Sequence, residues 1–499
     1  MQLSKSDYML FLRHPAWLWL KKHDKNKLPP IDEDLQAIFD AGFLFETYAE
    51  QLFPDSIRLG FDGFNEYRTL TARTKATIDS GASSIIQGRF EAGNITCICD
   101  VLVRVEGNTF DLYEIKSSTS AKPEHNPDLA FQVETIEGSG YKVNKVFVVH
   151  VNSEYVRNGE VKADEIAKIT EVTDQVKELK ESTLKNIQEA LEVANSRECP
   201  NISPAHTKMG AYSDWLGIYK TLADIDEYSI HHLCSPSADK IGELEKMGIK
   251  DLASIPDGFE LSEKQQNQVN ATKYDKVFID KPCIGAFLDD LKYPLYFLDY
   301  ETLSSVIPYF DGLGPYKQLP FQYSLHVLES PGAEIQHFEY LHQDSSNPVK
   351  PLSDALKSQI GTEGTVLVWF ERFEKSCNQL MGLVSPEHTQ FYEELNDRIV
   401  DLMIPFSTCA YVHKDFFGSA SIKKVLPVLI PELSYKDLDI HAGGAAQRLW
   451  MEAVLDGKRP NEKDKILSDL RKYCELDTFA MVRIYQHLLE VVRDPVASH

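Results

Sequence analysis

The sequence has no cysteine pair in C-x-x-C spacing, no apolar run near the length of a bilayer span, and no excess of basic residues. Its eight cysteines are dispersed over 499 residues, and only Cys97 and Cys99 lie close together. A disulfide scaffold is therefore excluded, and we expect reduced, buried thiols. The first residues, which include Lys5 and Asp7, carry too many charges for a signal peptide or a membrane anchor. We therefore expect a cytoplasmic protein that has no membrane partner.

The composition is that of a globular protein with several cores. Hydrophobic residues make up 43% of the chain and charged residues 26%, which excludes a disordered or collagen-like protein. The length predicts roughly two to four domains. Lys and Arg number 52 against 76 Asp and Glu, which gives a net charge of −24. This balance argues against bulk electrostatic wrapping of nucleic acid, but it is compatible with a local basic groove or with carboxylates gathered around metal ions.

The periodicity of the sequence changes along the chain and divides it into three parts. Residues 1–220 begin with helical spacing and continue with strands, among them a predicted hairpin with a Gly107-Asn108 turn. Residues 221–290 read as a helical connector, in which Lys240 to Leu252 is similar to a helix-hairpin-helix. Residues 291–499 open on a buried strand and end in a long helix. The expected fold class is therefore α/β and multidomain.

The first group of candidate catalytic residues lies on the predicted hairpin. On a strand, side chains two residues apart share a face, so Glu114 and Lys116 lie side by side while Ile115 turns into the core. Asp100 lies on the preceding strand and can join them. Two carboxylates suit a hard cation such as Mg²⁺, and a neighbouring lysine can orient or deprotonate a water. Glu-x-Lys alone is also common on exposed strands.

The second group lies in the C-terminal part. A hydrophobic strand ends in Asp299-Tyr-Glu301, which places both carboxylates on one face, and Tyr473 and Asp477 are four residues apart on a helix. An apolar strand that becomes acidic is costly unless the charges meet cations or solvent. A strand end exposed to solvent is the structural alternative.

In the N-terminal part, the order of these residues resembles the PD-(D/E)XK nuclease core, and within it the RecB-like branch. The resemblance rests on Asp100, on Glu114-Ile-Lys116, on Glu46 in a preceding helix and on Gln132 in a following one. It implies a restriction-endonuclease-like α/β core in which Asp100 and Glu114 hold metal and Lys116 acts on the attacking water. Glu46 would be the acid of the first helix and Gln132 the trailing polar residue.

Many relatives in this branch hold an iron–sulfur cluster through one N-terminal cysteine and three later ones. Here His14 stands at the first position, and Cys199 is the one cysteine kept in the later segment. Because such a cluster requires four thiolates, we predict that it is absent. A residual zinc site made of His14, Cys199 and His206 is an alternative.

In the C-terminal part, Asp-x-Glu followed much later by Tyr-x-x-x-Asp resembles the DnaQ-like 3′–5′ exonucleases of the DEDD type, tyrosine subgroup. The resemblance implies an RNase H-like fold, two Mg²⁺ or Mn²⁺ ions bound by four carboxylates, and a Tyr473 hydroxyl that aims the attacking water. Glu374 is the favoured intermediate acid and Asp401 its competitor. A candidate phosphate-contacting loop consists of His413, Ser419, Ser421, Lys423 and Lys424.

Taken together, the order resembles an uncharacterised bacterial family that fuses a RecB-like nuclease domain to a DnaQ-like domain. It implies a metal-dependent nuclease with two active centres that acts on single-stranded DNA or DNA ends, in repair or in defence against foreign DNA. One alternative is a nucleic-acid-binding or assembly protein with one or both centres inactive. Another is an exonuclease directed at RNA. The sequence gives no oligomeric state.

Overall fold

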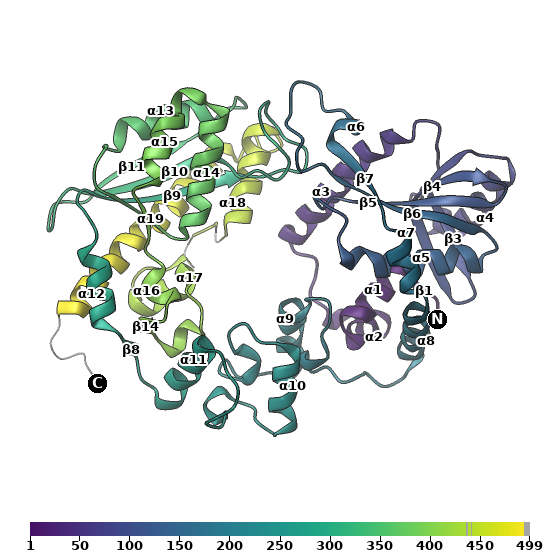
Figure 1. Cartoon of the computed structure of the whole chain (residues 1–499), viewed down its shortest axis with the longest axis horizontal. Helices are drawn as coiled ribbons and strands as arrows, with labels where there is room; N and C mark the ends of the chain where they lie inside the picture. The colour runs from purple at the N-terminus through teal and green to yellow at the C-terminus, as the bar shows by residue number, and fades with distance from the viewer. Residues whose placement is uncertain (436–437, 441, 494–499) are drawn as a thin grey trace. The chain divides into compact units, whose positions relative to one another are not determined.

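The computed structural model describes residues 1–435, 438–440 and 442–493 (Figure 1). The chain divides into two compact units. The first comprises Met1–Ile225, Ser237–Glu243 and Val306–Pro315, and the second comprises the rest. Within the described residues, the first unit holds a mixed seven-stranded sheet and the second a mixed five-stranded sheet. The prediction of a multidomain α/β protein is therefore confirmed. The predicted boundaries after residues 220 and 290 stay predictions.

The sheet of the first unit has the strand order β2-β3-β4-β5-β6-β7, with β1 paired to β4. Its strands are β1 (Leu3–Ser4), β2 (Ile57–Arg58), β3 (Ser84–Ala92), β4 (Ile95–Glu106), β5 (Thr109–Lys116), β6 (Lys142–Val151) and β7 (Ala167–Glu171). Strands β4 and β5 are antiparallel and meet at Gly107, whose positive φ of 49° suits glycine, so the predicted hairpin is confirmed. Strand β5 runs parallel to β6, and the chain crosses between them through a helix.

The first unit also contains helices, several of which pack against this sheet. They are α1 (Lys5–Arg13), α2 (Pro15–His23), α3 (Glu33–Ala49), α4 (Phe64–Asp79), α5 (Asn126–Gly138), α6 (Ala163–Ile166), α7 (Thr173–Glu178), α8 (Lys180–Asn195) and α9 (Tyr212–Ala223). Helix α5 is the crossover between β5 and β6, and its Leu129 and Phe131 are fully buried in one cluster with Leu112 and Val148 of the sheet. This core fixes the polar residues of α5 beside the end of β5.

The sheet of the second unit has the strand order β11-β10-β9-β12-β13. Its strands are β9 (Leu295–Leu303), β10 (Leu319–Leu328), β11 (Gln336–Leu341), β12 (Thr365–Val368) and β13 (Ile399–Asp401). Strands β9, β10 and β11 are antiparallel, whereas β12 and β13 run parallel to β9. The central position of β9 explains its continuous apolar run, because helices cover both of its faces.

Helices of the second unit cover both faces of this sheet, and others lie away from it (Figure 1). Tyr300 and Tyr323 hydrogen-bond to α14 (Glu371–Val384) and α13 (Val349–Gln359) on one face. The other face packs against α19 (Lys463–Arg493) and α18 (Gly443–Trp450). Further elements are α11 (Glu263–Tyr274), β8 (Phe278–Ile279), α12 (Lys281–Asp289), α15 (Thr389–Asn396), α16 (Ile404–Ser407), β14 (Tyr411–Val412) and α17 (Ile422–Leu429). The predicted connector, residues 221–290, also contains the helix α10 (Ala238–Lys246).

No helix among the described residues is both long enough and apolar enough to cross a membrane.

Candidate metal centres

Two acids lie side by side on the central strand of the second unit. Asp299 and Glu301 are two residues apart on β9 and project from the face that α19 covers, because side chains of one strand alternate between faces. Glu301 is only 7% exposed. The Cys474 sulfur lies 4.0 Å from Asp299 Oδ2, and one ligand atom of each of these three residues lies within 4.8 Å of the others. The sequence analysis did not predict Cys474.

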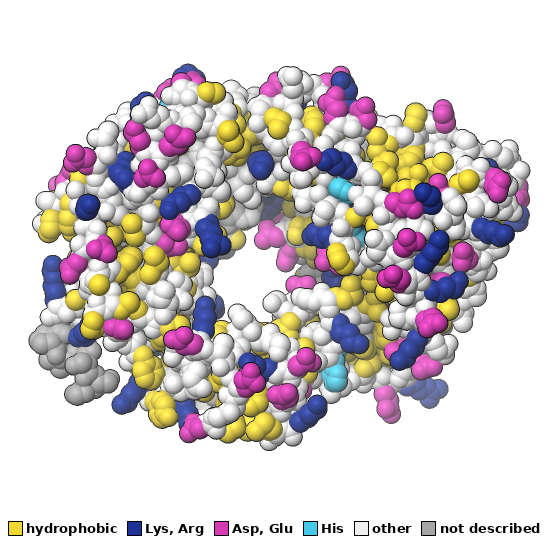
Figure 2. Space-filling view, viewed as in Figure 1, with side chains coloured by type: hydrophobic (Ala, Val, Ile, Leu, Met, Phe, Trp, Pro, Cys, Tyr) yellow, Lys and Arg dark blue, Asp and Glu magenta, His cyan; other side chains and the backbone are white. Residues whose placement is uncertain are grey.

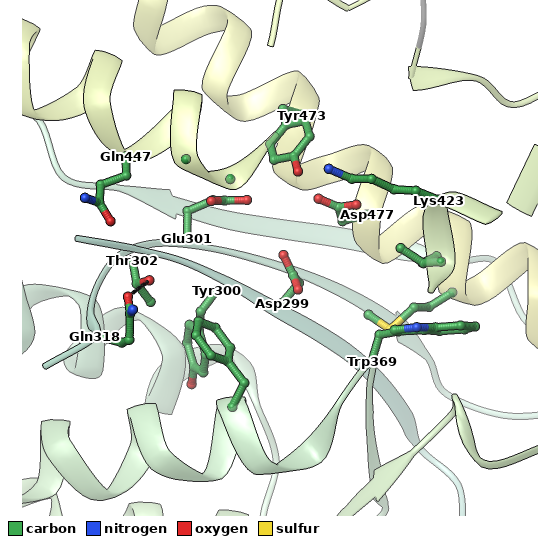
Figure 3. Close-up of a pocket in the computed structure, with 15 residues that line it drawn as sticks. Asp299, Tyr300, Glu301, Thr302, Gln318, Trp369, Lys423, Gln447, Tyr473 and Asp477 are labelled. Atoms are coloured by element: carbon green, nitrogen blue, oxygen red, sulfur yellow. Dashed lines mark hydrogen bonds between the residues drawn. The ribbon is translucent and has the colours of Figure 1, made fainter. Parts of the chain in front are cut away.

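Helix α19 brings the predicted tyrosine and the third carboxylate to the same place. Tyr473 and Asp477 are one helical turn apart, and both line a pocket of about 380 Å³ together with Asp299 and Glu301. Figure 3 shows the three carboxylates and the Tyr473 hydroxyl pointing toward one another, with the Lys423 ammonium directed at Asp477. The structure therefore brings together residues from β9, α17 and α19.

Tyr435 is a contact that sequence reasoning missed. Its hydroxyl donates a hydrogen bond of 2.5 Å to Asp477 Oδ1. Lys423 Nζ lies over both this ring and that of Tyr473, 5.7 and 5.5 Å from the two ring centroids. No spacing or motif in the sequence connects Tyr435 to Asp477, because a loop delivers it to the site.

The carboxylates of this centre repel one another. Burial, followed by repulsion from Asp477, raises the pKa of Asp299 well above its usual value. Burial, followed by repulsion from Asp299, raises the pKa of Glu301 in the same way. Burial raises the pKa of Asp477 to about 6, although the Tyr435 hydroxyl and Lys423 favour its ionised form. Without cations, these acids can ionise together only at high cost, so a bound cation would favour their ionised forms.

The two candidates for the intermediate acid differ in their surroundings. Asp401, at the end of β13, accepts hydrogen bonds from the backbone N–H groups of Phe370, Glu371 and Met403. Phe370 has a φ of 84°, so these bonds hold a strained turn at the start of α14. Glu374, by contrast, is 1% exposed and its Oε2 has no hydrogen-bond partner within the described chain. Asp401 supports the backbone, whereas Glu374 is the better candidate ligand.

Glu374→Gln should stabilise the metal-free protein at pH 8, because glutamine cannot ionise and so removes the repulsion from Asp299. Burial, followed by repulsion from Asp299, raises the pKa of Glu374. The contribution of the protonated acid to stability is therefore fully present below the pKa of the unfolded state, and it is lost as the pH rises through the pKa of the folded state. The gain should therefore shrink toward pH 5. Thermal unfolding in EDTA at both pH values measures it.

Asp401→Asn is the matched control for that measurement. It should lower the stability at both pH values, because the amide cannot replace a carboxylate that accepts three backbone hydrogen bonds. A Glu374→Gln protein that is less stable than the wild type at pH 8 would contradict the unpaired, repelled state assigned to Glu374.

Of the predicted phosphate-contacting residues, only Lys423 lines the pocket. Lys424, one position further along α17, lies over the Phe417 ring with its Nζ 5.2 Å from the centroid. The other three residues lie in the segment before α17. Ser419 accepts a hydrogen bond from the Ser421 backbone N–H, and His413 Nδ1 accepts one from the Asp415 N–H. The side chains of Ser419 and His413 thus support local turns, and none of the three residues lines the pocket.

The first unit assembles the other predicted centre at the end of β5, beside Asp100 in the middle of β4. Lys116 Nζ donates to Glu114 Oε1 at 2.6 Å, and Asp100 Oδ2 accepts from the Ile115 backbone N–H at 2.8 Å. Gln132, on α5, donates to Glu114 Oε2 at 2.7 Å. Four predicted residues are thus gathered around the end of one strand.

Two charged residues of this centre were not predicted from the sequence. Lys5, on α1, donates to Glu114 Oε1 at 2.8 Å, and Asp128, on α5, accepts from Lys116 Nζ at 2.8 Å. The four-residue spacing between Asp128 and Gln132 on a helix could have indicated Asp128. The contact of Lys5 with Glu114 could not be inferred from spacing, because only tertiary packing brings α1 to the end of β5.

The charges of this centre largely neutralise each other. Burial opposes ionisation of Glu114, but Lys116 and Lys5 outweigh it and hold the pKa of Glu114 well below its usual value. Burial, and then Glu114, raises the pKa of Asp100 to about 8. Glu46 adds to that shift and itself accepts a hydrogen bond from Gln87 at 2.6 Å. Even beside Lys5 and Lys116, Asp100 therefore holds its proton more tightly than a free carboxyl group when no metal ion is bound.

The alternative zinc ligands do not converge in the described part of the chain. Both ring nitrogens of His14 are engaged, with Nε2 3.0 Å from the Ser203 carbonyl and Nδ1 accepting from the Ala16 N–H. The ring is fully buried and stacks on Trp215 at 3.9 Å, which makes it a core residue, and Cys199 is exposed. The predicted absence of an iron–sulfur cluster stays a prediction.

Comparison with known proteins identifies relatives without a described function. A family described as a domain of unknown function (DUF2779) matches residues 296–421, which include Asp299, Glu301 and Glu374 but not Tyr473 or Asp477. "Uncharacterized protein MG366" of Mycoplasma genitalium is 26% identical over 258 residues, or 47% of this chain and 35% of that protein. "Uncharacterized protein UU173" of Ureaplasma parvum is 23% identical over 360 residues, or 66% of this chain and 51% of that protein.

The chain thus spans about a third to a half of the length of these curated relatives. It carries a DUF2779 domain at residues 296–421 and is distantly homologous to uncharacterized proteins of Mycoplasma and Ureaplasma.

Proposed function

We propose that the protein is a metal-dependent nuclease with two active centres, the C-terminal one removing nucleotides from the 3′ end of DNA. The observation that carries this proposal is the convergence of Asp299, Glu301, Asp477 and Tyr473 on one pocket. These residues come from segments far apart in the sequence, so chance alternation of charges on a strand does not explain their meeting. The proposed RNase H-like and restriction-endonuclease-like folds of the two units belong to the same hypothesis.

The donor set of the C-terminal centre fits Mg²⁺ or Mn²⁺. Asp299, Glu301 and Asp477 offer carboxylate oxygens, which hard divalent cations prefer. Within the described residues, Glu374 Oε2 is buried without a hydrogen-bond partner, and a cation would satisfy it. The raised pKa values of Asp299 and Glu301 indicate the same lack of positive charge. Bound cations would stabilise charge on a scissile phosphate and lower the pKa of an attacking water.

The remaining side chains of the pocket have roles that follow from their charge. Burial, then Asp477, raises the pKa of Tyr473, so its hydroxyl stays protonated and orients a water through a hydrogen bond instead of removing a proton. Lys423 carries a positive charge at the pocket wall, where it offsets the charge of a bound phosphate. Trp369 also lines the pocket and offers a ring on which a terminal base can stack.

Local groups of this kind are needed because the surface provides no general attraction for nucleic acid. Figure 2 shows basic and acidic side chains interspersed on the visible face of the described residues. The net charge of −24 also repels the phosphates of nucleic acid. We therefore place DNA binding in the pocket and its surroundings, and single strands or ends are the substrates that can enter it.

The wild-type protein provides the first test. We expect 5′-labelled single-stranded DNA to be shortened stepwise from its 3′ end with Mg²⁺ or Mn²⁺ and to stay intact in EDTA. A matched RNA strand, assayed in parallel, distinguishes a DNA enzyme from the RNA-directed alternative. If no strand is cleaved with either metal, the proposed activity is wrong.

A second candidate function is favoured by the charge balance of the first unit. Glu114 has hydrogen-bond donors on both oxygens. Two of these donors are lysine ammonium groups, which neutralise the carboxylate without a metal ion. This favours a first unit that binds nucleic acid without cutting it, with catalysis confined to the C-terminal centre. A single strand with a blocked 3′ end separates the two functions, because it can be cut only at an internal bond or from its 5′ end.

A further inference from the structure

We propose that the second unit contains a separate zinc site made of His326, His337 and Glu475. One potential ligand atom of each residue lies within 4.8 Å of the others. His326 and His337 are directly opposite each other on β10 and β11, and Glu475 reaches them from α19. This inference concerns a different group of side chains from the acidic centre and does not depend on the proposed nuclease activity.

Two hydroxyl groups engage one ring nitrogen of each histidine. Thr478 Oγ1 lies 2.8 Å from His326 Nδ1, and Ser324 Oγ lies 2.9 Å from His337 Nε2. The two hydroxyl oxygens are 2.6 Å apart, so both histidines belong to one hydrogen-bond network.

This network leaves the other nitrogen of each ring for a metal ion. When Thr478 and Ser324 accept from His326 Nδ1 and His337 Nε2, the lone pairs are on His326 Nε2 and His337 Nδ1. His337 Nδ1 lies 3.9 Å from Glu475 Oε1, too far for a hydrogen bond. Metal-binding histidines characteristically donate their other N–H group to a fixed acceptor, and Thr478 and Ser324 provide such acceptors here.

The chemistry of the three ligands selects the metal. Two imidazoles and one carboxylate suit zinc, whereas Mg²⁺ prefers a shell of oxygens, as in the acidic centre. A tetrahedral zinc ion needs ligand atoms roughly 3.3 Å apart, which follows from metal–ligand distances of about 2.0 Å. Glu475 is 51% exposed and can rotate toward the histidines, whereas His326 is 4% exposed and fixed. The partly exposed His337 leaves room for a water at the fourth position.

The position of the site suggests what zinc would do. It would join β10, β11 and α19 through one ion, so α19 would be fixed against the sheet. Tyr473 and Asp477 lie two residues before and after Glu475 on that helix. Zinc here would act as a structural clamp that holds these two side chains in register with β9.

The test is zinc binding to the full-length chain in an excess of Mg²⁺, followed by X-ray absorption at the zinc edge. We expect about one zinc per chain, with scattering from two imidazoles and zinc–ligand distances near 2.0 Å. His337→Ala should weaken binding by at least about 100-fold and remove part of the imidazole signal. Thr478→Val, which removes an outer acceptor, should weaken it about tenfold.

His487→Ala is the matched control, since it removes a half-buried histidine from the same helix outside the group. It should bind zinc like the wild type. If His337→Ala fails to fold, the exposed Glu475→Gln variant takes its place and should lose at least about tenfold in affinity. The proposal is overturned if the wild type binds no zinc or binds it without imidazole scattering. It is also overturned if His337→Ala and Glu475→Gln bind zinc like the wild type.

Discussion

Replacing Asp299 with asparagine is expected to slow the removal of 3′-terminal nucleotides by at least about 10³-fold. The change keeps the shape of the side chain but removes a negative charge from a group in which Glu301 and Asp477 would share the cations. Loss of one ligand costs several kcal/mol of transition-state stabilisation, and about 1.4 kcal/mol corresponds to tenfold in rate. The rate is measured on 5′-labelled single-stranded DNA at saturating Mn²⁺.

Two controls distinguish this loss from unfolding. Asp290→Asn changes an exposed acid in the same unit and should keep the wild-type rate. Asp299→Asn should unfold at the same temperature as the wild type in EDTA, or at a higher one, because the mutation relieves repelling buried charges. An Asp299→Asn protein with more than about a tenth of the wild-type rate would show that the cluster does not carry the reaction.

The strand and helix periodicities explain why much of this centre was accessible from the sequence. The two-residue period placed Asp299 and Glu301 on one face of β9, and the helical turn placed Tyr473 and Asp477 together on α19. Both patterns depend only on local backbone geometry. The coarse α/β, multidomain architecture followed from the same periodicities, and its two mixed sheets agree with it.

The parts that escaped prediction depend on tertiary packing. Lys423 and Lys424 are adjacent and equivalent in the sequence, yet only Lys423 lines the pocket, because the orientation of α17 decides between them. Tyr435 and Lys5 reach their carboxylates through tertiary contacts that no spacing in the sequence encodes. The backbone hydrogen bonds of Asp401 could not be inferred either, since they require knowledge of the turn at Phe370.

Lys116→Met is expected to lower cleavage of a 3′-blocked single strand by about 10²–10⁴-fold, the usual contribution of a positioned acid–base group. The blocked end excludes trimming by the C-terminal centre, so this substrate reports the first unit alone. Methionine keeps the length of the side chain but loses the ammonium that contacts Glu114 and Asp128. The same variant should trim an unblocked strand from its 3′ end at the wild-type rate.

Lys5→Met provides the sharper comparison, because Lys5 contacts the same Glu114 oxygen as Lys116. If Lys5 only neutralises Glu114 when no cation is bound, its removal should lower the Mn²⁺ concentration needed for half-maximal cleavage, since one competing cation is gone. Lys75→Met, at an exposed surface pair, should change neither quantity. Equal losses in Lys5→Met and Lys116→Met would contradict a specific role for Lys116, and a wild type that leaves the blocked strand intact would favour a first unit that binds without cutting.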